Sequence, residues 1–259
     1  MSLFGVIQDV HGPWEDKKAL SLAIYVFKEQ GISHLILNGD IFDFYNINAH
    51  GPKDPYIQTS MEDEMEWGND FFDMLAKELP GVKIIFLFGN HEDRLNRYIM
   101  KNCPAFTNIV RLEKYLRLDE RGIEWYPYNE RYRIEETDLF VQHSPPSYSE
   151  NAASTSLKHK IDQDHIWGCT HRTDMSVRTG SSGKVYTSYM NGWFGSKTII
   201  QQNQKEMPEN KRVFKFTKNH ERWNCSFSLV TTDGNKHHVQ QIIIKDYQCA
   251  VGNMIYEES

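Results

Sequence analysis

Long hydrophobic runs are missing from this 259-residue sequence, and none approaches the roughly 18 residues that a membrane-spanning helix needs. The first residues also lack the layout of a signal peptide. Cysteine is scarce: the sequence has four, and no two of them have a paired spacing. These absences argue against a membrane protein and against a disulfide-stapled secreted domain, and we expect a protein of the reducing cytoplasm that makes no membrane contact.

An excess of positive charge is missing too, because the net charge is −6 and the isoelectric point is about 6.0. Proteins that hold nucleic acid on a broad basic surface are usually basic, so a plain nucleic-acid binder is disfavoured. A nuclease is not excluded, since bound divalent ions supply local positive charge. With 39% hydrophobic residues the chain can build a full core, and composition alone leaves one large α/β domain or two small ones open.

The first half of the chain alternates between strand-like and helix-like segments. The expected strands are short apolar runs that suit a sheet buried on both faces, at residues 3–7, 34–37 and 83–88. The expected helices between them are residues 16–30, which Gly31 would end, and residues 60–79, which Ser60 would begin with Asp63 three residues on. This alternating order predicts right-handed crossovers and a parallel central sheet.

The second half is richer in strand signals. Residues 139–142, 165–167 and 184–190 are candidate strands, and residues 226–232 and 237–245 flank an Asp-Gly turn that predicts a β-hairpin. The stretch 191–221 is polar and irregular, which predicts a loop.

Five short motifs rich in metal ligands occur in order along the chain. They are Asp9-Val10-His11, Gly39-Asp40-Ile41-Phe42-Asp43, Gly89-Asn90-His91-Glu92, a single His143, and Gly168-Cys169-Thr170-His171. The first four each close a hydrophobic run, so we place them at strand ends, where open α/β sheets form their sites. Neighbouring strands lie about 4.8 Å apart, which would gather these tips into one cluster. Carboxylates, an amide and imidazoles are the donors that a pair of hydrolytic metal ions needs.

Each motif alone has an ordinary structural explanation. Asp-x-His and Gly-Asp-x-x-Asp are common in turns, and Asn90 is a good helix start. An isolated histidine such as His143 is more often hydrogen-bonded inside a core, and Cys169 more often packs as a small apolar residue. The order, spacing and strand-end placement of the motifs together favour a metal site over these structural explanations.

The full set resembles the calcineurin-like metallophosphoesterase superfamily over residues 9–171. The stretch of residues 89–98 further resembles a branch common in bacteria and their phages, whose substrates are largely unassigned. Phe44-Tyr45 follows the second motif, where the serine/threonine protein phosphatases of the superfamily have Arg-Gly. The resemblance implies an α/β fold, a β-sandwich flanked by helices with the metal site at the strand carboxyl ends, in a single domain of residues 1–259.

The resemblance also implies a division of roles within the site. One ion would be held by Asp9, His11 and His171, the other by Asn90 and His143, with Asp40 bridging both. A hydroxide between two ions roughly 3.5–4 Å apart would attack the phosphorus. Manganese is the first expectation for both ions, with iron, zinc, nickel or magnesium as alternatives.

Other residues would act around the ions. His91 would protonate the leaving oxygen or stabilise its charge. Asp43 or Glu92 would orient imidazoles. Arg94 and Arg172 are candidate phosphate contacts, because a guanidinium matches phosphate oxygens, although a surface arginine is as good an explanation of each.

Cys169 departs from the family pattern, which has a histidine there as a ligand of the second ion. Three outcomes are open. The thiolate ligates and favours softer ions; the thiol lies close without ligating, so that the second ion is held weakly; or His165 or His159 takes its place.

We therefore predict a metal-dependent hydrolase of phosphate esters. A phosphodiester or nucleotide-like substrate is favoured, with nucleic acid among the candidates, because aromatic residues that could stack on a base are plentiful, although packing explains most of them equally well. These residues are Phe44, Tyr45, Tyr56, Trp125, Tyr126, Trp193 and Phe194. The alternatives are a phosphomonoesterase, or a catalytically weakened relative that acts as a binding or scaffold protein. Whether residues 51–67 form a lid is left open.

Overall fold

The structure, a computed structural model, describes residues 1–47, 59–158, 163–196 and 222–258. Its largest sheet has six strands in the order β11-β10-β1-β2-β3-β4. The strands are β1 (Ser2–Ile7), β2 (His34–Asn38), β3 (Lys83–Leu87), β4 (Glu124–Tyr126), β10 (Cys225–Asp233) and β11 (Lys236–Ile244). β1 to β4 run parallel, as the sequence predicts, while β10 pairs antiparallel with β1 and with β11. A strand from the end of the chain therefore lies beside the first one.

A second sheet has five strands in the order β5-β6-β7-β9-β8. They are β5 (Tyr132–Arg133), β6 (Leu139–Gln142), β7 (Asp164–Trp167), β8 (Asp174–Thr179) and β9 (Val185–Met190). The two sheets pack face to face through buried aliphatic residues of β1, β2, β6 and β7, among them Val6, Ile36, Val141 and Ile166. The molecule is thus a β-sandwich, as the resemblance implied.

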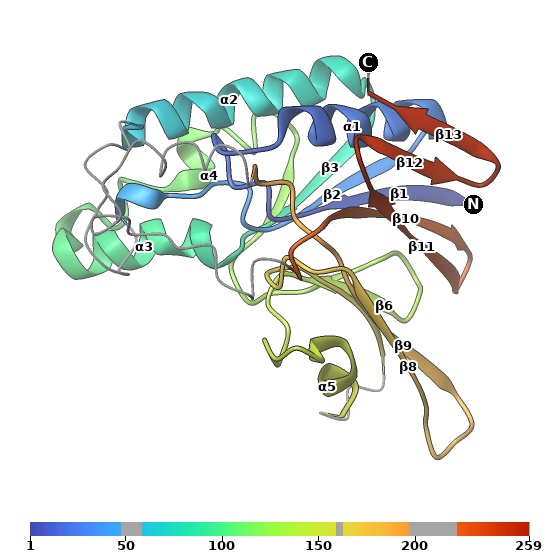
Figure 1. The fold of residues 1–259 in the computed structure, drawn as a ribbon. Helices are drawn as coiled ribbons and strands as arrows, with labels where there is room; N and C mark the ends of the chain where they lie inside the picture. The colour runs from blue at the N-terminus through green and yellow to red at the C-terminus, as the bar shows by residue number, and fades with distance from the viewer. Residues whose placement is uncertain (48–58, 159–162, 197–221, 259) are drawn as a thin grey trace, which may run out of the picture.

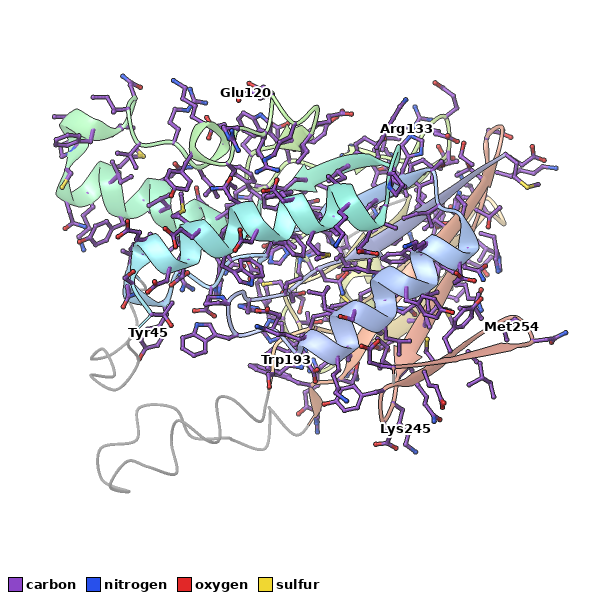
Figure 2. The ribbon with its side chains drawn as sticks, turned by 90° about the horizontal axis from the view of Figure 1, so that it is seen from above. Tyr45, Glu120, Arg133, Trp193, Lys245 and Met254 are labelled. Atoms are coloured by element: carbon purple, nitrogen blue, oxygen red, sulfur yellow. The ribbon has the colours of Figure 1, made fainter. Side chains whose placement is uncertain are left out.

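Helices cover the outer faces of the sandwich (Figure 1). α1 (Lys17–Gln30) and α2 (Met61–Glu78) lie on the first sheet and bury their apolar faces in the larger core cluster. The short α5 (Ala152–Lys158) packs on the second sheet, where Ala152 and Ala153 contact Trp167 and Met190. Viewed from above, α1 and α2 run across the first sheet (Figure 2). Among the described residues, no helix is long and apolar enough to cross a bilayer.

Local signals explain the boundaries of these two long helices. The Asp16 carboxylate accepts from the Ala19 N–H at 3.2 Å and begins α1, and Gly31 ends it at a left-handed φ of 64°. Ser60 and Asp63 form a reciprocal capping box at the start of α2. The helix positions predicted from the sequence are therefore confirmed.

Several elements were not predicted. α3 (Asn90–Asn102) begins directly in the third motif, α4 (Leu112–Tyr115) is a single turn, and β12 (Gln248–Val251) pairs with β13 (Met254–Glu257) in a terminal hairpin. The 3₁₀ turns η1 (Tyr45–Ile47) and η2 (Pro104–Phe106) follow β2 and α3. Residues 191–196 have no helix or strand, as expected for a loop, whereas residues 197–221 fall outside the described residues. Of residues 51–67, for which a lid was left open, residues 51–58 with Tyr56 also fall outside, and residues 61–67 belong to α2.

Candidate metal centre

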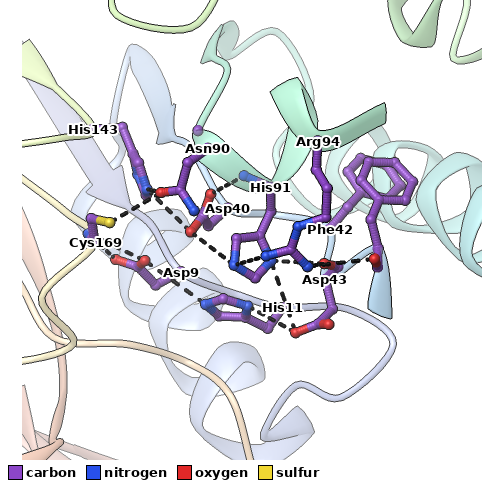
Figure 3. A network of polar contacts seen from close by, with 12 residues as sticks. Asp9, His11, Asp40, Phe42, Asp43, Asn90, His91, Arg94, His143 and Cys169 are labelled. Carbon is purple, nitrogen blue, oxygen red and sulfur yellow. Dashed lines mark hydrogen bonds and ion pairs between the residues drawn. The ribbon is translucent and has the colours of Figure 1, made fainter. Parts of the chain in front are cut away.

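The motif residues gather where the strands of both sheets end (Figure 3). Asp9 and His11 follow β1, Asp40 follows β2, and Asn90 opens α3 after β3. His143 follows β6, and Cys169 and His171 follow β7 in the second sheet. Backbone bonds fix these loops against one another, as from Asp9 N–H to the Gly39 carbonyl at 2.9 Å and from Gly168 N–H to the His143 carbonyl at 2.9 Å.

The first group of donors is formed by Asp9, His11 and His171, whose ligand atoms all lie within 4.8 Å of one another. His171 Nε2 is 3.3 Å from Asp9 Oδ1 and 3.1 Å from His11 Nε2. The Asp43 carboxylate accepts from His11 Nδ1–H at 3.1 Å, which leaves the His11 Nε2 lone pair facing the other donors. Asp43 thus holds the His11 ring, and its role in orienting a metal-bound imidazole stays a prediction.

The second group is formed by Asp40, His143 and Cys169, again within 4.8 Å. His143 Nδ1–H donates to the Asn38 carbonyl at 2.6 Å, so its Nε2 lone pair points into the site. That Nε2 atom lies 3.2 Å from Asp40 Oδ2 and 3.2 Å from Asn90 Oδ1. The Asn90 side chain therefore joins this group as a further oxygen donor.

Both groups fit divalent cations, because electron-pair donors converge in them without enough protons between them. Burial acts to lower the pKa of His143, yet the Asp40 carboxylate raises it well above its usual range. Burial would raise the pKa of Asp40, yet His143 and His91 hold it well below its usual range. Without a cation, these shifts make Asp40 and His143 an ion pair, and a bound cation would take the place of the proton on His143.

Asp40 lies close to both groups. Its Oδ1 accepts from the His91 N–H at 2.8 Å, its Oδ2 faces His143, and its charge helps to raise the pKa of His11 against the effect of burial, after the larger effect of Asp43. A buried carboxylate that is close to His143 and also acts on His11 has the position that a bridging ligand would need.

His91 stands beside the donors and is held from both ring nitrogens. Its Nδ1–H donates to the Asp43 carbonyl at 2.7 Å, and Arg94 Nη2 donates to its Nε2 at 2.9 Å. Burial lowers the pKa of His91 to about 4 in spite of the nearby Asp40 charge. The imidazole is therefore neutral at neutral pH, and the positive charge beside it belongs to Arg94.

Glu92 plays a different part from the one suggested by the sequence, which was to orient an imidazole. Its buried carboxylate accepts from four backbone N–H groups: Gly89 at 2.6 Å, Asp40 at 2.9 Å, Ile41 at 2.8 Å and Phe42 at 3.0 Å. Burial, followed by the Asp40 charge, raises its pKa to about 7. Glu92 thus joins the turn after β2 to the start of α3, and it shapes the loop that carries Asp40.

The ligand loops adopt a backbone that side chains rarely take. Five site residues have left-handed φ angles: Asp9 (52°), His11 (53°), Asp40 (50°), Cys169 (63°) and His171 (58°). Such conformations cost of order 1–3 kcal/mol each and cluster at functional sites.

The two arginines differ in what they contact. Arg94 Nη1 donates to the Asp43 carbonyl at 2.9 Å and so lies within the site. The Arg172 guanidinium donates to the carbonyls of Tyr148 and Ser149, at 3.3 and 2.8 Å, and so holds the loop after β6. This contact gives Arg172 a structural role, and the phosphate contact suggested for it stays a prediction.

An aromatic wall borders the first donor group. The Trp193 ring stacks on His171, with centroids 5.2 Å apart at 16°, and the half-buried Trp223 meets the same imidazole edge-on at 4.3 Å. The sequence flagged Trp193 but not Trp223, and it missed the Asn38 carbonyl because a backbone acceptor leaves no sequence signal. Phe44 and Phe194 are fully buried, so packing accounts for them.

The family model described as calcineurin-like phosphoesterase matches residues 3–172 of the sequence. The chain belongs to this family. The match includes all five motifs that meet here and ends one residue beyond His171. A search of curated proteins gives no match.

Solved structures resemble the fold at low identity. Vps29 from Cryptosporidium parvum is 15% identical, with 99% of this chain and 98% of that chain covered and a TM-score of 0.47. Vps29 from Entamoeba histolytica, complexed with Zn²⁺, is 12% identical, with 96% of each chain covered and a TM-score of 0.46. A dimetal phosphatase from Danio rerio is 12% identical, with 100% and 99% covered and a TM-score of 0.42.

Proposed function

We propose that this calcineurin-like phosphoesterase hydrolyses a phosphate ester with two divalent metal ions, as a single domain of residues 1–259 in the cytoplasm. The observation that carries the proposal is the pair of converging donor groups at the strand ends, Asp9/His11/His171 and Asp40/His143, with Asn90 beside the second. Two bound ions would supply positive charge for the phosphate and lower the pKa of water. Manganese is our first choice, with iron, zinc, nickel or magnesium as alternatives.

The protein residues then divide the remaining work. Asp43 and the Asn38 carbonyl fix the tautomers of His11 and His143, so that each presents a lone pair to its ion. Asp40, whose Oδ2 faces His143 and whose charge acts on His11, would be the ligand shared by both ions. His91 and Arg94 act as a pair: the guanidinium donates to His91 Nε2 at 2.9 Å and stabilises negative charge that develops on the phosphate or the leaving oxygen.

A phosphodiester or nucleotide-like substrate is favoured within this class. The half-buried Trp223 ring lies 4.3 Å from the His171 ring, where a planar group of a bound substrate would be able to stack. Nucleic acid remains a candidate substrate despite the net charge of −6, because the bound ions would supply the local attraction.

The test compares Asp40→Asn with Asp70→Asn, an exposed aspartate on α2. Hydrolysis of an aryl phosphodiester and of the matching monoester is measured in Mn²⁺ and in chelator. We expect diester turnover that chelator abolishes and that Asp40→Asn lowers by at least about 100-fold, while Asp70→Asn is unchanged. Monoester-only activity would overturn the substrate preference. Equal background hydrolysis in the wild type and Asp40→Asn would overturn the proposal that the protein is an enzyme.

One observation favours a second candidate, a catalytically weakened relative that serves as a binding or scaffold protein. Cys169 stands where the family pattern has a histidine, which would weaken the second metal position. The hydrogen bonds that fix His91 and Arg94 argue against the scaffold candidate, because a scaffold needs no charge-stabilising pair beside its metal ligands.

A further inference from the structure

The Cys169 side chain points into the second donor group (Figure 3). Its Sγ lies 3.1 Å from Asn90 Oδ1 and within 4.8 Å of the ligand atoms of Asp40 and His143. The other three cysteines, Cys103, Cys225 and Cys249, belong to none of the donor groups found among the described residues. Cys169 alone thus adds a sulfur atom to three convergent oxygen and nitrogen donors.

The turn after β7 holds this sulfur in place. Cys169 has a left-handed φ of 63°, and its backbone N–H donates to both oxygens of Asp9, at 2.9 and 3.2 Å. The N–H of the preceding residue, Gly168, donates to the His143 carbonyl at 2.9 Å. A side chain that only filled space would not require a strained backbone. The strained backbone of Cys169 is instead held by Asp9, a candidate ligand of the first ion.

The alternative replacement for the missing histidine does not reach the site. His165 lies on β7 between Phe140 and Trp167, with ring centroids 5.6 and 4.6 Å away, and its Nδ1 contacts the Gln163 carbonyl. It belongs to no donor group in the described part of the chain. His159 falls outside the described residues.

We infer that Cys169 ligates the second ion as a thiolate, together with Asp40, Asn90 and His143, so that this position selects a thiophilic ion such as Zn²⁺, Fe²⁺ or Co²⁺ over Mg²⁺. The inference rests on the proposed function. On binding, the S–H bond breaks, its proton leaves to solvent, and a sulfur–metal bond forms. Ligands about 2.0–2.3 Å from one ion lie roughly 3–4 Å from one another. Asn90 Oδ1 is 3.1 Å from Cys169 Sγ and 3.2 Å from His143 Nε2, and His143 Nε2 is 3.2 Å from Asp40 Oδ2, which fits such a set.

A thiolate makes the two metal positions chemically different. The group of Asp9, His11 and His171 offers only oxygen and nitrogen, whereas the group with Cys169 also offers sulfur. Soft donors bind zinc, iron and cobalt more tightly than magnesium or calcium. We therefore expect a centre that fills its second position with a thiophilic ion first.

The test titrates the full-length, metal-free protein with Co²⁺ and follows thiolate-to-cobalt charge-transfer absorption in the near ultraviolet. Cys169→Ser is compared with Cys225→Ser, a cysteine of similar partial burial on β10. We expect the absorption band in the wild type and in Cys225→Ser, and no band in Cys169→Ser. In Cys169→Ser the Zn²⁺ affinity of one of the two metal positions should also fall at least about 10-fold. If Cys169→Ser does not fold, Cys169→His takes its place, with two ions bound and no band.

Each outcome decides. A band that persists without Cys169, or a wild type that binds two Co²⁺ ions without the band, overturns the thiolate ligand while leaving the proposed hydrolase standing. A wild type that binds no Co²⁺ overturns both the thiolate ligand and the dinuclear centre. Loss of the band in Cys169→Ser alone supports the inference, whatever the substrate is.

Discussion

Glu64 is a fully buried carboxyl group on α2, beneath the loop that follows Asp43. Its Oε2 accepts from the Phe44 N–H at 2.6 Å, while its Oε1 has no hydrogen-bond partner among the described residues. Burial, followed by the charge of Asp43, raises its pKa to about 8. The folded protein therefore keeps Glu64 protonated at neutral pH, where the unfolded chain ionises it.

This shift makes the stability depend on pH. The folded pKa is raised, so the contribution of Glu64 is complete below the unfolded pKa of 4.5 and is lost as the pH rises through about 8. We expect the stability of the Glu64→Gln variant to fall less with rising pH than the stability of the wild type. At pH 8.5 the variant should be more stable than the wild type by on the order of 1–4 kcal/mol. Urea unfolding at pH 5.5, 7 and 8.5 measures it, with Glu66→Gln on the exposed face of α2 as control. Parallel pH curves for wild type and Glu64→Gln would contradict the prediction.

His91 gives a second prediction for a single side chain. Because the His91 ring nitrogens are engaged by the Asp43 carbonyl and by Arg94, we expect the side chain to act on charge in the site and not as a ligand. His91→Gln should therefore lower kcat by about 100- to 10,000-fold with the metal content unchanged. Steady-state kinetics and elemental analysis of the same preparation measure both quantities. The exposed His238→Gln should match the wild type. Loss of metal together with activity in His91→Gln would make His91 a ligand instead.

Much of the candidate site was predictable at this scale, and the reason is local. Asp9, Asp40, Asn90 and His143 each follow an apolar run, so the sequence itself marks them as strand-end residues that the structure brings together. What the sequence could not show were contacts to the backbone. Glu92 binds four N–H groups and His143 donates to a carbonyl, and such partners have no residue type to recognise.

Among the elements, the turn after β2 and the start of α3 approach each other unusually closely. Gly39 has a φ of 78°, and a Cβ atom there would lie 2.6 Å from the His143 ring and 2.7 Å from the Gly89 Cα. The Glu92 carboxylate also joins these two segments, because it accepts from the N–H groups of Asp40 and Gly89. The position of the Asp40 carboxylate thus depends on a gap that only glycine leaves open.

We expect Gly39→Ala to displace His143 and to abolish binding at the second metal position. Gly81 is a matched control, because its φ of 79° carries the same backbone strain while nothing lies within 4 Å of its added Cβ. Gly81→Ala should cost only about 1–2 kcal/mol of stability and keep metal binding. Urea unfolding and metal titration of both variants separate strain from steric clash. Equal effects in the two variants would refute the role of the close approach.

The elements themselves were predicted unevenly. α1, α2 and the first three strands came out within a residue or two, because helix caps and continuous apolar runs are strong local signals. β8 was missed because it is an exposed edge strand whose burial alternates between half-buried and exposed. α3 was missed because its sequence is dominated by charged and polar residues, and because its first turn was interpreted as a ligand motif.

Across the whole molecule, the candidate ligands come from both halves of the sandwich. Asp9, His11, Asp40 and Asn90 follow strands of the first sheet, and His143, Cys169 and His171 follow strands of the second. Any ion bound between them links the two sheets, and unfolding must release it.

Metal removal should therefore lower the thermal stability of the intact protein. An ion at about 100 times its dissociation constant adds about 2.7 kcal/mol, or a rise in Tm of roughly 5–10 °C for a chain of this size. Calorimetry with Mn²⁺ or with chelator measures the shift. It should shrink in Asp40→Asn and persist in Asp70→Asn. A wild type with the same Tm in both buffers would contradict binding across the sheets.

The late strand beside β1 has a consequence for how the protein is made. β10 pairs with β1 through Ser2↔Thr232, the Phe194 N–H donates to the Asp9 carbonyl at 2.9 Å, and the Asn224 N–H donates to the His171 carbonyl at 3.1 Å. A nascent chain that has emerged from the ribosome only as far as residue 172 already contains every candidate ligand. It still lacks the partners that brace the first and last of them. The metal centre would therefore mature only after translation has passed Thr232.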